Sequence, residues 1–342
     1  MDVKIPRKLN IIQSLSFVSE IAALPQAEEY VFDFQDLQWS EPFGLLIVSY
    51  ELSSFASAHG SSRLAVRNYE KNTYEGHMGF FKAFGLDYGK SPGEALGNSS
   101  CIPIKIKSVK TLQEKAFSDH VAVGEIIEDY ANEISNVLVQ NQAEELRKTL
   151  TYSIREIIRN VVEHSESLQF GYCAQYWSAK DMVEFSLLDK GVGIRATLDN
   201  NPHLDISSDK DALELSLLPG ISGKMYKGKR NRKNDVWANS GFGLYMTSRI
   251  CGNGGSFFII SGSFGIMLNN KKRYYINANF QGTALRLRLN TKNIENLSQV
   301  LQRYRNEGYE IAKQLGSRAI VSPSTASQML SKEFNSKEFI GI

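Results

Sequence analysis

The sequence predicts a mixed chain of the α+β and α/β classes, with two domains followed by a helical tail. Strand-like and helix-like segments alternate over the first part of the chain, and helically spaced apolar residues then precede several strand-like runs. The 342 residues exceed one typical domain, and a hydrophobic content of 42% supplies one large core or two modest ones. We expect a small α/β domain at 1–110, a domain of helices on a mixed sheet at 120–290, and a C-terminal helix and tail at 291–342.

The first domain is expected to be an α/β layer. The run EYVFDF at 29–34 predicts a strand, and Pro42 and Gly60 predict the start and the end of a helix. The polar, turn-rich run at 90–100 predicts a loop. The pattern continues with strands at 62–66 and 102–107 and a helix at 74–84. The boundary of this domain should then lie near residue 110.

The second domain is expected to place helices over a sheet. Apolar residues at helical spacing from about 120 to 165 predict two helices, separated near Asn141. A last helix is expected at 294–315, and the Ser-rich tail after it is left open between a mobile segment and one that docks on a partner. Five strand-like runs lie between these helices, at 167–177, 182–188, 256–260, 274–280 and 283–289.

Charge and cysteine content exclude several classes of protein. Lys and Arg number 39 against 37 Asp and Glu, a net charge near +2, so the chain lacks the basic footprint of a duplex-binding domain. The three cysteines are scattered without CxxC spacing, which predicts neither a disulfide framework nor a zinc site. No apolar run of about 18 residues and no cleavable leader is visible. We therefore expect a cytoplasmic protein without a membrane or nucleic-acid partner.

A helix and a loop carry residues typical of a nucleotide site. Glu156 and Asn160 lie four residues apart on a predicted helix, so both point to the same side. Asp189, Gly191 and Gly193 follow a predicted strand. A carboxylate beside an amide oxygen can position a water molecule and bind a metal ion. Neither helix stability nor core packing requires this combination.

Together with two later motifs, these residues resemble the GHKL, or Bergerat-fold, histidine-kinase-like ATPases. The likeness covers roughly residues 125 to 290, and each motif has the structural context that the family uses. The four motifs in chain order are Glu156-x-x-x-Asn160, Asp189-x-Gly191-x-Gly193, Gly241-x-Gly243-Leu244 and Gly282-Thr283.

The resemblance implies a role for each residue. Asp189 would accept a hydrogen bond from the adenine amino group, and Asn160 would bind Mg²⁺. Glu156 would be catalytic, because it would position the water that attacks the γ-phosphate of ATP. The remaining contacts with ATP would come from Gly191 and Gly193 beside the purine, Gly241, Gly243 and Leu244 at the polyphosphate, and Thr283 at the floor of the site.

Two further features bear on this site. The run Asn-Val-Val-Glu-His ending at His164 resembles the anti-sigma-factor kinase branch of the family, although a helical histidine is more often structural. The segment 194–240 is long enough to be a lid over the nucleotide. Its basic residues are Lys224, Lys227, Lys229, Arg230, Arg232 and Lys233. They are either exposed to solvent, in contact with the phosphates, or in contact with nucleic acid. Lys224 is the first choice for a contact with phosphate.

Other interpretations of these motifs fit less well. The run from Gly191 to Ala196 matches the dinucleotide fingerprint GxGxxA, but that motif should open the first strand–helix unit of its domain. The run from Gly220 to Lys224 lacks the spacing and the hydroxyl residue of a phosphate loop. Glu156 alone could be an exposed helix residue, but the other three motifs favour the ATP site.

Residues 29 to 66 resemble STAS-like domains, the fold of anti-sigma-factor antagonists, and this likeness covers about the first 110 residues. In that family a phosphorylatable Ser or Thr precedes the Gly-Leu pair that opens the helix, whereas here Pro42 and Phe43 precede Gly44. Ser40 is nearby, but a serine before a helix is most simply a cap or turn residue. The resemblance therefore implies a docking or oligomerisation surface.

These resemblances imply an ATP- and Mg²⁺-binding regulatory protein with slow ATPase activity, whose nucleotide orders the lid and changes how the STAS-like domain meets a protein partner. One alternative is a serine/threonine kinase of the anti-sigma-factor type that acts on a separate protein. Another is an ATP-dependent binding module that does not hydrolyse ATP. A sensor histidine kinase fits poorly, because only His120 lies near the place of its phosphoacceptor. Bergerat ATPases often form dimers, so a homodimer stays open.

Overall fold

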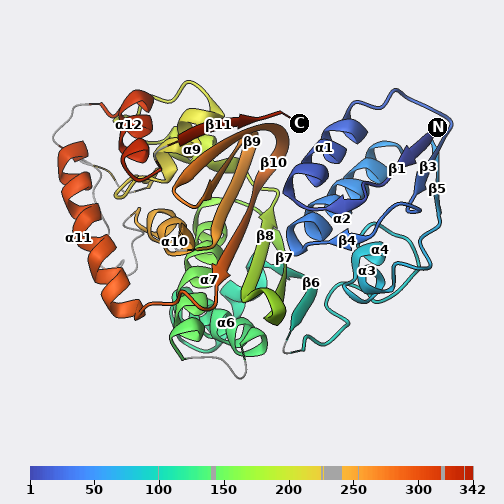
Figure 1. Cartoon of the computed structure of the whole chain (residues 1–342), viewed down its shortest axis with the longest axis horizontal. Coiled ribbons are helices and arrows are strands. Elements are labelled where there is room, and N and C mark those ends of the chain that lie inside the picture. The colour runs from blue at the N-terminus through green and yellow to red at the C-terminus, as the bar shows by residue number, and fades with distance from the viewer. Residues whose placement is uncertain are drawn as a thin grey trace.

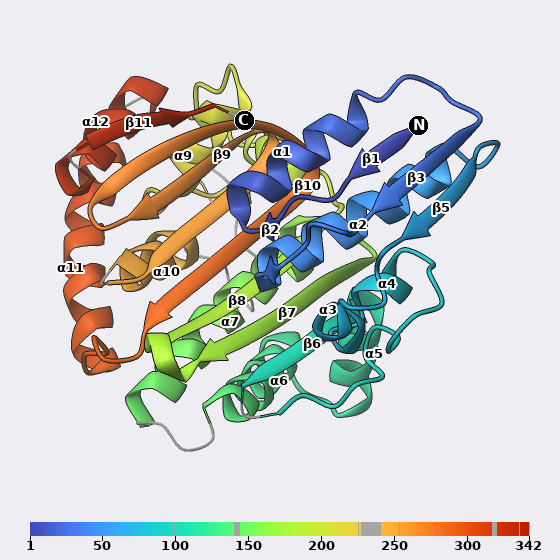
Figure 2. The ribbon, with the colours of Figure 1, turned by 45° about the vertical axis from the view of Figure 1, so that its right-hand side comes forward.

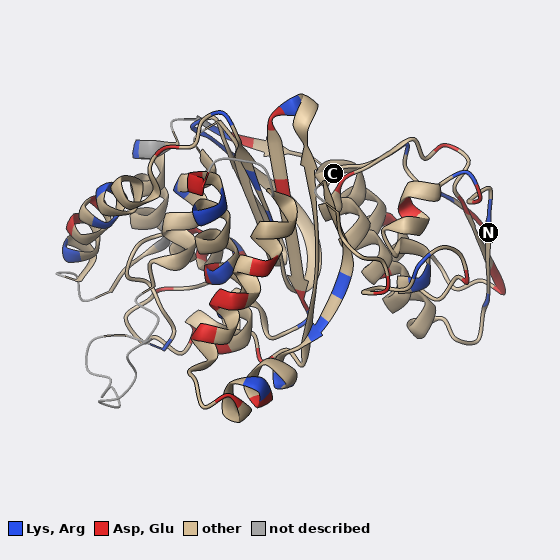
Figure 3. Cartoon of the chain, turned by 90° about the horizontal axis from the view of Figure 1, so that it is seen from below, with Lys and Arg blue, Asp and Glu red and all other residues tan. Residues whose placement is uncertain are grey.

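The chain forms a mixed α/β structure, which confirms the class expected from the sequence (Figure 1). The computed structural model describes residues 1–98, 100–139, 144–224, 226, 241–252, 254–316, 320–334 and 336–341. A large sheet lies in the middle, with the N-terminal residues on one side and long helices on the other. Lys and Arg are interspersed with Asp and Glu along the ribbon, in keeping with the net charge near +2 (Figure 3).

Residues 1–98, here called the N-terminal unit, contain a three-stranded parallel sheet and four helices. The sheet has the order β1 (Asp2–Lys4), β3 (Glu29–Asp33) and β5 (Arg63–Arg67), and β2 (Lys8–Leu9) pairs separately with β4 (Trp39–Ser40). The helices are α1 (Ile11–Ala22), α2 (Pro42–Ala58), α3 (Thr73–His77) and α4 (Phe80–Ala83).

Most elements predicted for this unit are confirmed. The strands expected at 29–34 and 62–66 form, and a helix begins at Pro42 as predicted. The helix expected at 74–84 is instead two short helices, because Gly79 between them has a left-handed backbone with φ +84°. Helix α1 was missed, although Asn10 caps it by accepting a hydrogen bond from the Gln13 N–H.

The large sheet contains six strands, in the order β11–β10–β8–β7–β6, with β9 also paired with β10. The strand expected at 102–107 forms but pairs antiparallel with β7, so its predicted place in the first domain is wrong. The runs expected at 256–260, 274–280 and 283–289 belong to two long strands, β9 and β10. The strands are β6 (Cys101–Ser108), β7 (Gln169–Trp177), β8 (Met182–Asp189), β9 (Ser256–Asn269), β10 (Lys272–Asn290) and β11 (Ser336–Ile340).

Helices cover one face of this sheet, here called the helical face. Two long helices lie where the sequence predicts them, and the expected break near Asn141 falls outside the described residues. A short 3₁₀ turn, Ser178–Lys180, joins β7 to β8. The helices of this part of the chain are α5 (Val109–Ser118), α6 (Val123–Leu138), α7 (Glu144–His164), α8 (Gly193–Leu198), α9 (Asp209–Ser216), α10 (Gly243–Gly252), α11 (Leu297–Gly316) and α12 (Pro323–Glu333).

The N-terminal unit packs on the opposite face of the sheet, here called the N-terminal face. Side chains of β8 alternate between the two sides: Phe185 and Leu187 enter the core under the helices, whereas Leu188 enters the core shared with α2. Figure 2 shows α1 and α2 lying across this face of the sheet. The N-terminal unit and the large sheet therefore share one buried interface.

The described part of the tail folds back onto the sheet of its own chain. Strand β11 pairs in parallel with the first half of β10, and α12 packs beside α9. Beneath α12, the fully buried Arg273 donates hydrogen bonds to Ser327 and Ser331. The tail is thus an edge of the large sheet. Among the described residues, no helix has the length and apolar character needed to cross a membrane.

Candidate functional site

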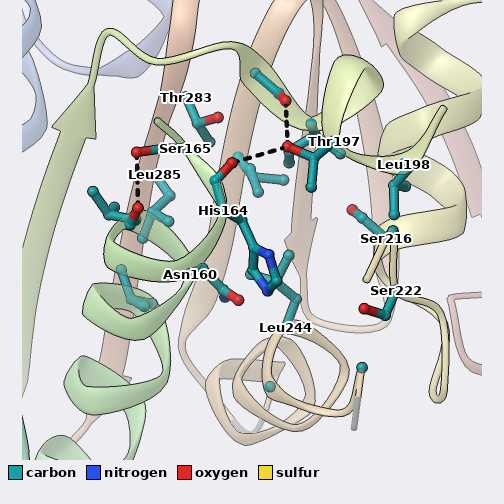
Figure 4. Close-up of a pocket in the computed structure, with 18 of the residues that line it drawn as sticks. Asn160, His164, Ser165, Thr197, Leu198, Ser216, Ser222, Leu244, Thr283 and Leu285 are labelled. Atoms are coloured by element: carbon teal, nitrogen blue, oxygen red, sulfur yellow. Dashed lines mark hydrogen bonds between the residues drawn. The ribbon is translucent and has the colours of Figure 1, made fainter. Parts of the chain in front are cut away.

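A cavity opens on the helical face between α7, α8 and α10 (Figure 4). The cavity has a volume of about 100 Å³, smaller than a typical small-molecule site, and it is open to solvent at its mouth. Its wall is largely apolar, with a few polar groups that converge from distant segments. Seven residues predicted for the nucleotide site line it: Asn160, Asp189, Gly193, Gly241, Gly243, Leu244 and Thr283.

Asp189 forms one end of the cavity, at the last residue of β8. Thr283 of β10 lies directly beside it in the sheet. The carboxylate is 3% exposed, and its Oδ1 accepts a 2.8 Å hydrogen bond from the Gly191 N–H. Its Oδ2 accepts no hydrogen bond from the residues that the structure describes. Burial raises the pKa of Asp189 to about 6, against the smaller lowering effect of the Gly191 N–H.

The glycines around Asp189 allow close approach of protein backbone. A Cβ on Gly191 would lie 1.8 Å from the Ser165 carbonyl oxygen, and one on Gly282 would lie 2.1 Å from the Asp189 carbonyl oxygen. Gly282 also has φ +93°, a conformation that other residues rarely adopt. Gly191 faces Ser165 and is not among the residues that line the cavity, and its predicted place beside the purine stays a prediction.

Asn160 and His164 line the other end, one turn apart on α7. The Asn160 Nδ2 is buried and has no hydrogen-bond partner among the described residues. Figure 4 shows both side chains projecting toward Leu244, near the start of α10. Burial lowers the pKa of His164 to about 4, with help from the nearby Lys224 and Arg159 cations, so its imidazole is neutral at physiological pH.

Glu156 lies outside the cavity wall, against the expectation for a catalytic residue. Its Oε2 is 2.7 Å from where a Gly243 Cβ would be, so the carboxylate lies directly behind the first residue of α10. Its Oε1 accepts a 2.8 Å hydrogen bond from Arg155, and Arg159 lies 3.8 Å away. The helix brings Glu156 close to the cavity, but two ion pairs hold it there without access.

The predicted lid is described only in part. Lys224 donates a hydrogen bond to the Glu163 carbonyl at the end of α7, and its exposed side chain does not line the cavity. Ile221, Ser222 and Gly223 do line it, although the sequence argument assigned them no role. The other basic residues of this segment lie outside the described residues: Lys227, Lys229, Arg230, Arg232 and Lys233.

Hydroxyl groups that the sequence argument missed complete the cavity. The Thr197 Oγ1 donates 2.9 Å to the Gly193 carbonyl and 3.3 Å to the His164 carbonyl, which ties α8 to the end of α7. Behind the lining residues, Ser261 connects α8 to β10, because its Oγ accepts a hydrogen bond from the Ile194 N–H and donates one to the Gly282 carbonyl. A Ser or Thr within or before a strand gives no sequence signal for such a contact.

Two phosphoacceptor candidates lie in unsuitable places. Ser40 is buried, and its hydroxyl donates a 2.6 Å hydrogen bond to Glu75. His120 is exposed in the turn between α5 and α6, with φ +55°, and does not belong to a helix. Neither position matches a side chain presented for phosphoryl transfer.

A metal ion at this cavity would depend on oxygen atoms from its ligand. No group of three His, Cys, Asp or Glu side chains within the described ranges could hold a metal ion by itself. Asn160 lines the cavity, where its side-chain oxygen could supply one ligand to a metal ion that takes its other ligands from a polyanion. Comparison of the chain with family models and with curated proteins gives no match.

Proposed function

We propose that the chain binds ATP with Mg²⁺ in this cavity and regulates a protein partner, with slow hydrolysis of ATP, in the manner of the GHKL ATPases that its motifs resemble. One observation supports the proposal most strongly. Asp189 and Asn160 come from different elements 29 positions apart, yet both line the same cavity, one at each end.

The Asp189 end suits an adenine ring. Among the described residues, one oxygen of its buried carboxylate has no hydrogen-bond partner, and such an oxygen strongly prefers a ligand that donates an N–H. The exocyclic amino group of adenine is such a donor. Guanine carries an oxo group at that position, and two acceptors facing each other would repel. Apolar residues in the cavity wall, such as Ile194 and Ile259, suit the faces of the ring.

The Asn160 end suits phosphates. Gly243 begins α10, so the free N–H groups and the positive dipole end of this ten-residue helix meet the cavity. Asn160 would hold the metal together with phosphate oxygens, and Mg²⁺ would neutralise charge on the phosphates when it is bound. His164 beside Asn160 is neutral and so adds no charge at this end.

Hydrolysis would require Glu156 to reach this end. The oxygen of a water molecule would attack the γ-phosphorus, Glu156 would take a proton from that water, and the bond between the γ-phosphorus and the β,γ-bridging oxygen would break to release ADP and phosphate. Because Glu156 is buried behind Gly243 and ion-paired, we expect turnover to be slow. The same observation favours the second candidate, a binding module that does not hydrolyse ATP.

A protein partner would meet the STAS-like N-terminal unit. Lys190, the residue after Asp189, points to the N-terminal face, where its ammonium pairs with Glu51 of α2 at 2.5 Å. A ligand that reorients the end of β8 therefore acts directly on α2. This contact supports a regulatory role that couples the nucleotide to the surface of the N-terminal unit.

Calorimetric titration with ATP, ADP and GTP, with and without Mg²⁺, tests the proposal. We expect ATP to bind and GTP to fail, and Asp189→Asn to weaken ATP binding by about 5- to 150-fold, because a buried unpaired polar group costs about 1–3 kcal/mol. Ser263→Ala, an exposed change on the same sheet, serves as the control. Equal affinity for ATP and GTP, or no loss with Asp189→Asn, would contradict the proposed adenine site.

A further inference from the structure

Arg155 contacts two carboxylates on different helices. Its Nη2 and Nε lie 2.8 and 3.2 Å from the Glu156 Oε1, and its Nη1 lies 3.4 Å from the Glu128 Oε2 on α6. The guanidinium also lies 5.2 Å from the ring centre of Tyr152. Because a guanidinium presents five N–H donors in a rigid plane, it can serve two acceptors at once.

The two carboxylates differ in their surroundings. The Glu156 side chain is 9% exposed and lies behind Gly243, whereas the Glu128 side chain is 45% exposed on the surface of α6. Arg155 thus spans the distance from solvent to the residue just behind the cavity wall. The Glu156 Oε1 accepts both N–H groups of Arg155, and the ion pair disfavours protonation of this carboxylate, whose Oε2 lies against Gly243.

The pair between Arg155 and Glu156 is not one that the helix itself favours. Neighbouring residues on a helix do not face each other, whereas residues three or four apart do. The contact between Arg155 and Glu156 therefore depends on other groups that position the guanidinium. These are Glu128 on α6 and the ring of Tyr152 on α7. Arg159 pairs at 3.0 Å with Glu163 and reaches Glu156 only at 3.8 Å.

We propose that Arg155 restrains ATP hydrolysis by holding Glu156 away from the cavity. A shift of the guanidinium toward Glu128 releases the carboxylate, which then turns toward the Asn160 end and accepts the proton of the attacking water. Arg155 is therefore a positioning residue that acts through Glu156. Its alternative partner, Glu128, lies on α6, so a movement of α6 would change the restraint. This inference rests on the proposed ATPase function.

Single-turnover hydrolysis by the full chain tests the restraint. Arg155→Met should raise the hydrolysis rate by about five- to tenfold while the Kd for ATP stays the same, since a free general base typically contributes more than this to a rate. Arg155→Lys should retain part of the restraint. Arg147→Met is the matched control, because Arg147 lies on the same helix in an exposed pair with Glu144 and should change neither quantity.

A double-mutant cycle with Glu128→Gln separates the restraint from a general structural defect. With Arg155 present, Glu128→Gln should lower the rate several-fold, because the guanidinium then binds Glu156 alone; with Arg155→Met it should have no effect. An unchanged or lower rate in folded Arg155→Met, or an equal effect of Glu128→Gln in both backgrounds, overturns the inference. If ATP binds but no variant hydrolyses it, only the restraint fails; if ATP does not bind, the proposed function itself fails.

Discussion

Two buried carboxylates on β8, Glu184 and Asp189, lie on opposite faces of the sheet and have opposite surroundings. Glu184 is fully buried on the N-terminal face, where it accepts hydrogen bonds from Arg288 at 2.6 Å, from the Phe43 N–H at 3.0 Å and from Ser186 at 3.2 Å. Asp189 on the helical face accepts one hydrogen bond and borders a cavity. A carboxylate whose oxygens are fully hydrogen-bonded stabilises the structure, whereas one with an unused oxygen at a cavity is available to a ligand.

The contacts of Glu184 attach the N-terminal unit to the large sheet. Arg288 also pairs at 2.7 Å with Glu41, the residue before α2, and Arg286 lies 3.9 Å from Glu184. Burial lowers the pKa of Arg286 to about 10, partly offset by Glu184, so the guanidinium stays charged at neutral pH. The cluster therefore has charges of both signs, each compensated from another element.

The largest expected effect distinguishes the two carboxylates by stability. Glu184→Gln should lower the free energy of unfolding by about 3–5 kcal/mol, because removing one partner leaves buried guanidinium charge uncompensated. Asp189→Asn should cause no such loss, since its carboxylate compensates no cation. Urea unfolding of both variants measures the difference. Equal losses would show that the two faces do not differ energetically.

The second prediction concerns pH and applies to Asp189 alone. Its pKa is raised from an ordinary value of 3.8 to about 6, so the neutral acid favours the folded state below about pH 4 and this contribution is lost as the pH rises through 6. Relative to Asp189→Asn, the wild type should lose about 2 kcal/mol of unfolding free energy between pH 4 and 7. Urea unfolding across this range measures the gap, and a constant gap would contradict the raised pKa.

The smallest expected effect concerns the contribution of the Ser261 hydroxyl to the structure around Asp189. Ser261→Ala leaves the Ile194 N–H and the Gly282 carbonyl without their hydroxyl partner, and should cost about 1–2 kcal/mol of stability and weaken ATP binding a few-fold. The exposed Ser263→Ala, two residues along β9, should change stability by less than about 0.5 kcal/mol. Matching results for the two serines would mean that the loops around Asp189 do not depend on this contact.

Local signals in the sequence were enough to predict α2 and the end of β8. Pro42 begins a helix because its fixed φ suits a first turn, and alternating apolar residues end at Asp189 where the strand ends. The pairing of β6 could not be predicted, because a strand pattern does not identify its neighbour. The polar run before Cys101 predicts a loop, but nothing in it shows that the next strand joins a different sheet.

The site was predicted in outline but not in its orientation. Helical spacing places Glu156 and Asn160 on one side of α7, yet only Asn160 lines the cavity. The Glu156 carboxylate is paired with Arg155 instead. The sequence analysis assigned no role to Glu184 within its strand. Its partner Arg288 lies 104 residues later, a separation at which sequence pattern carries no information.

Glu184 and Asp189 have different surroundings because they lie five positions apart in β8, an odd number, and therefore on opposite faces of the sheet. Side chains of a strand alternate with a period of two, so the loss of one residue after the turn at Asp181 would direct acid 184 into the core under the helices and acid 189 toward the N-terminal face. Point substitutions can tune either environment by degrees during evolution. A change in the length of this strand removes both carboxylates from their present environments at once, and so it should be excluded from any lineage that keeps the pocket.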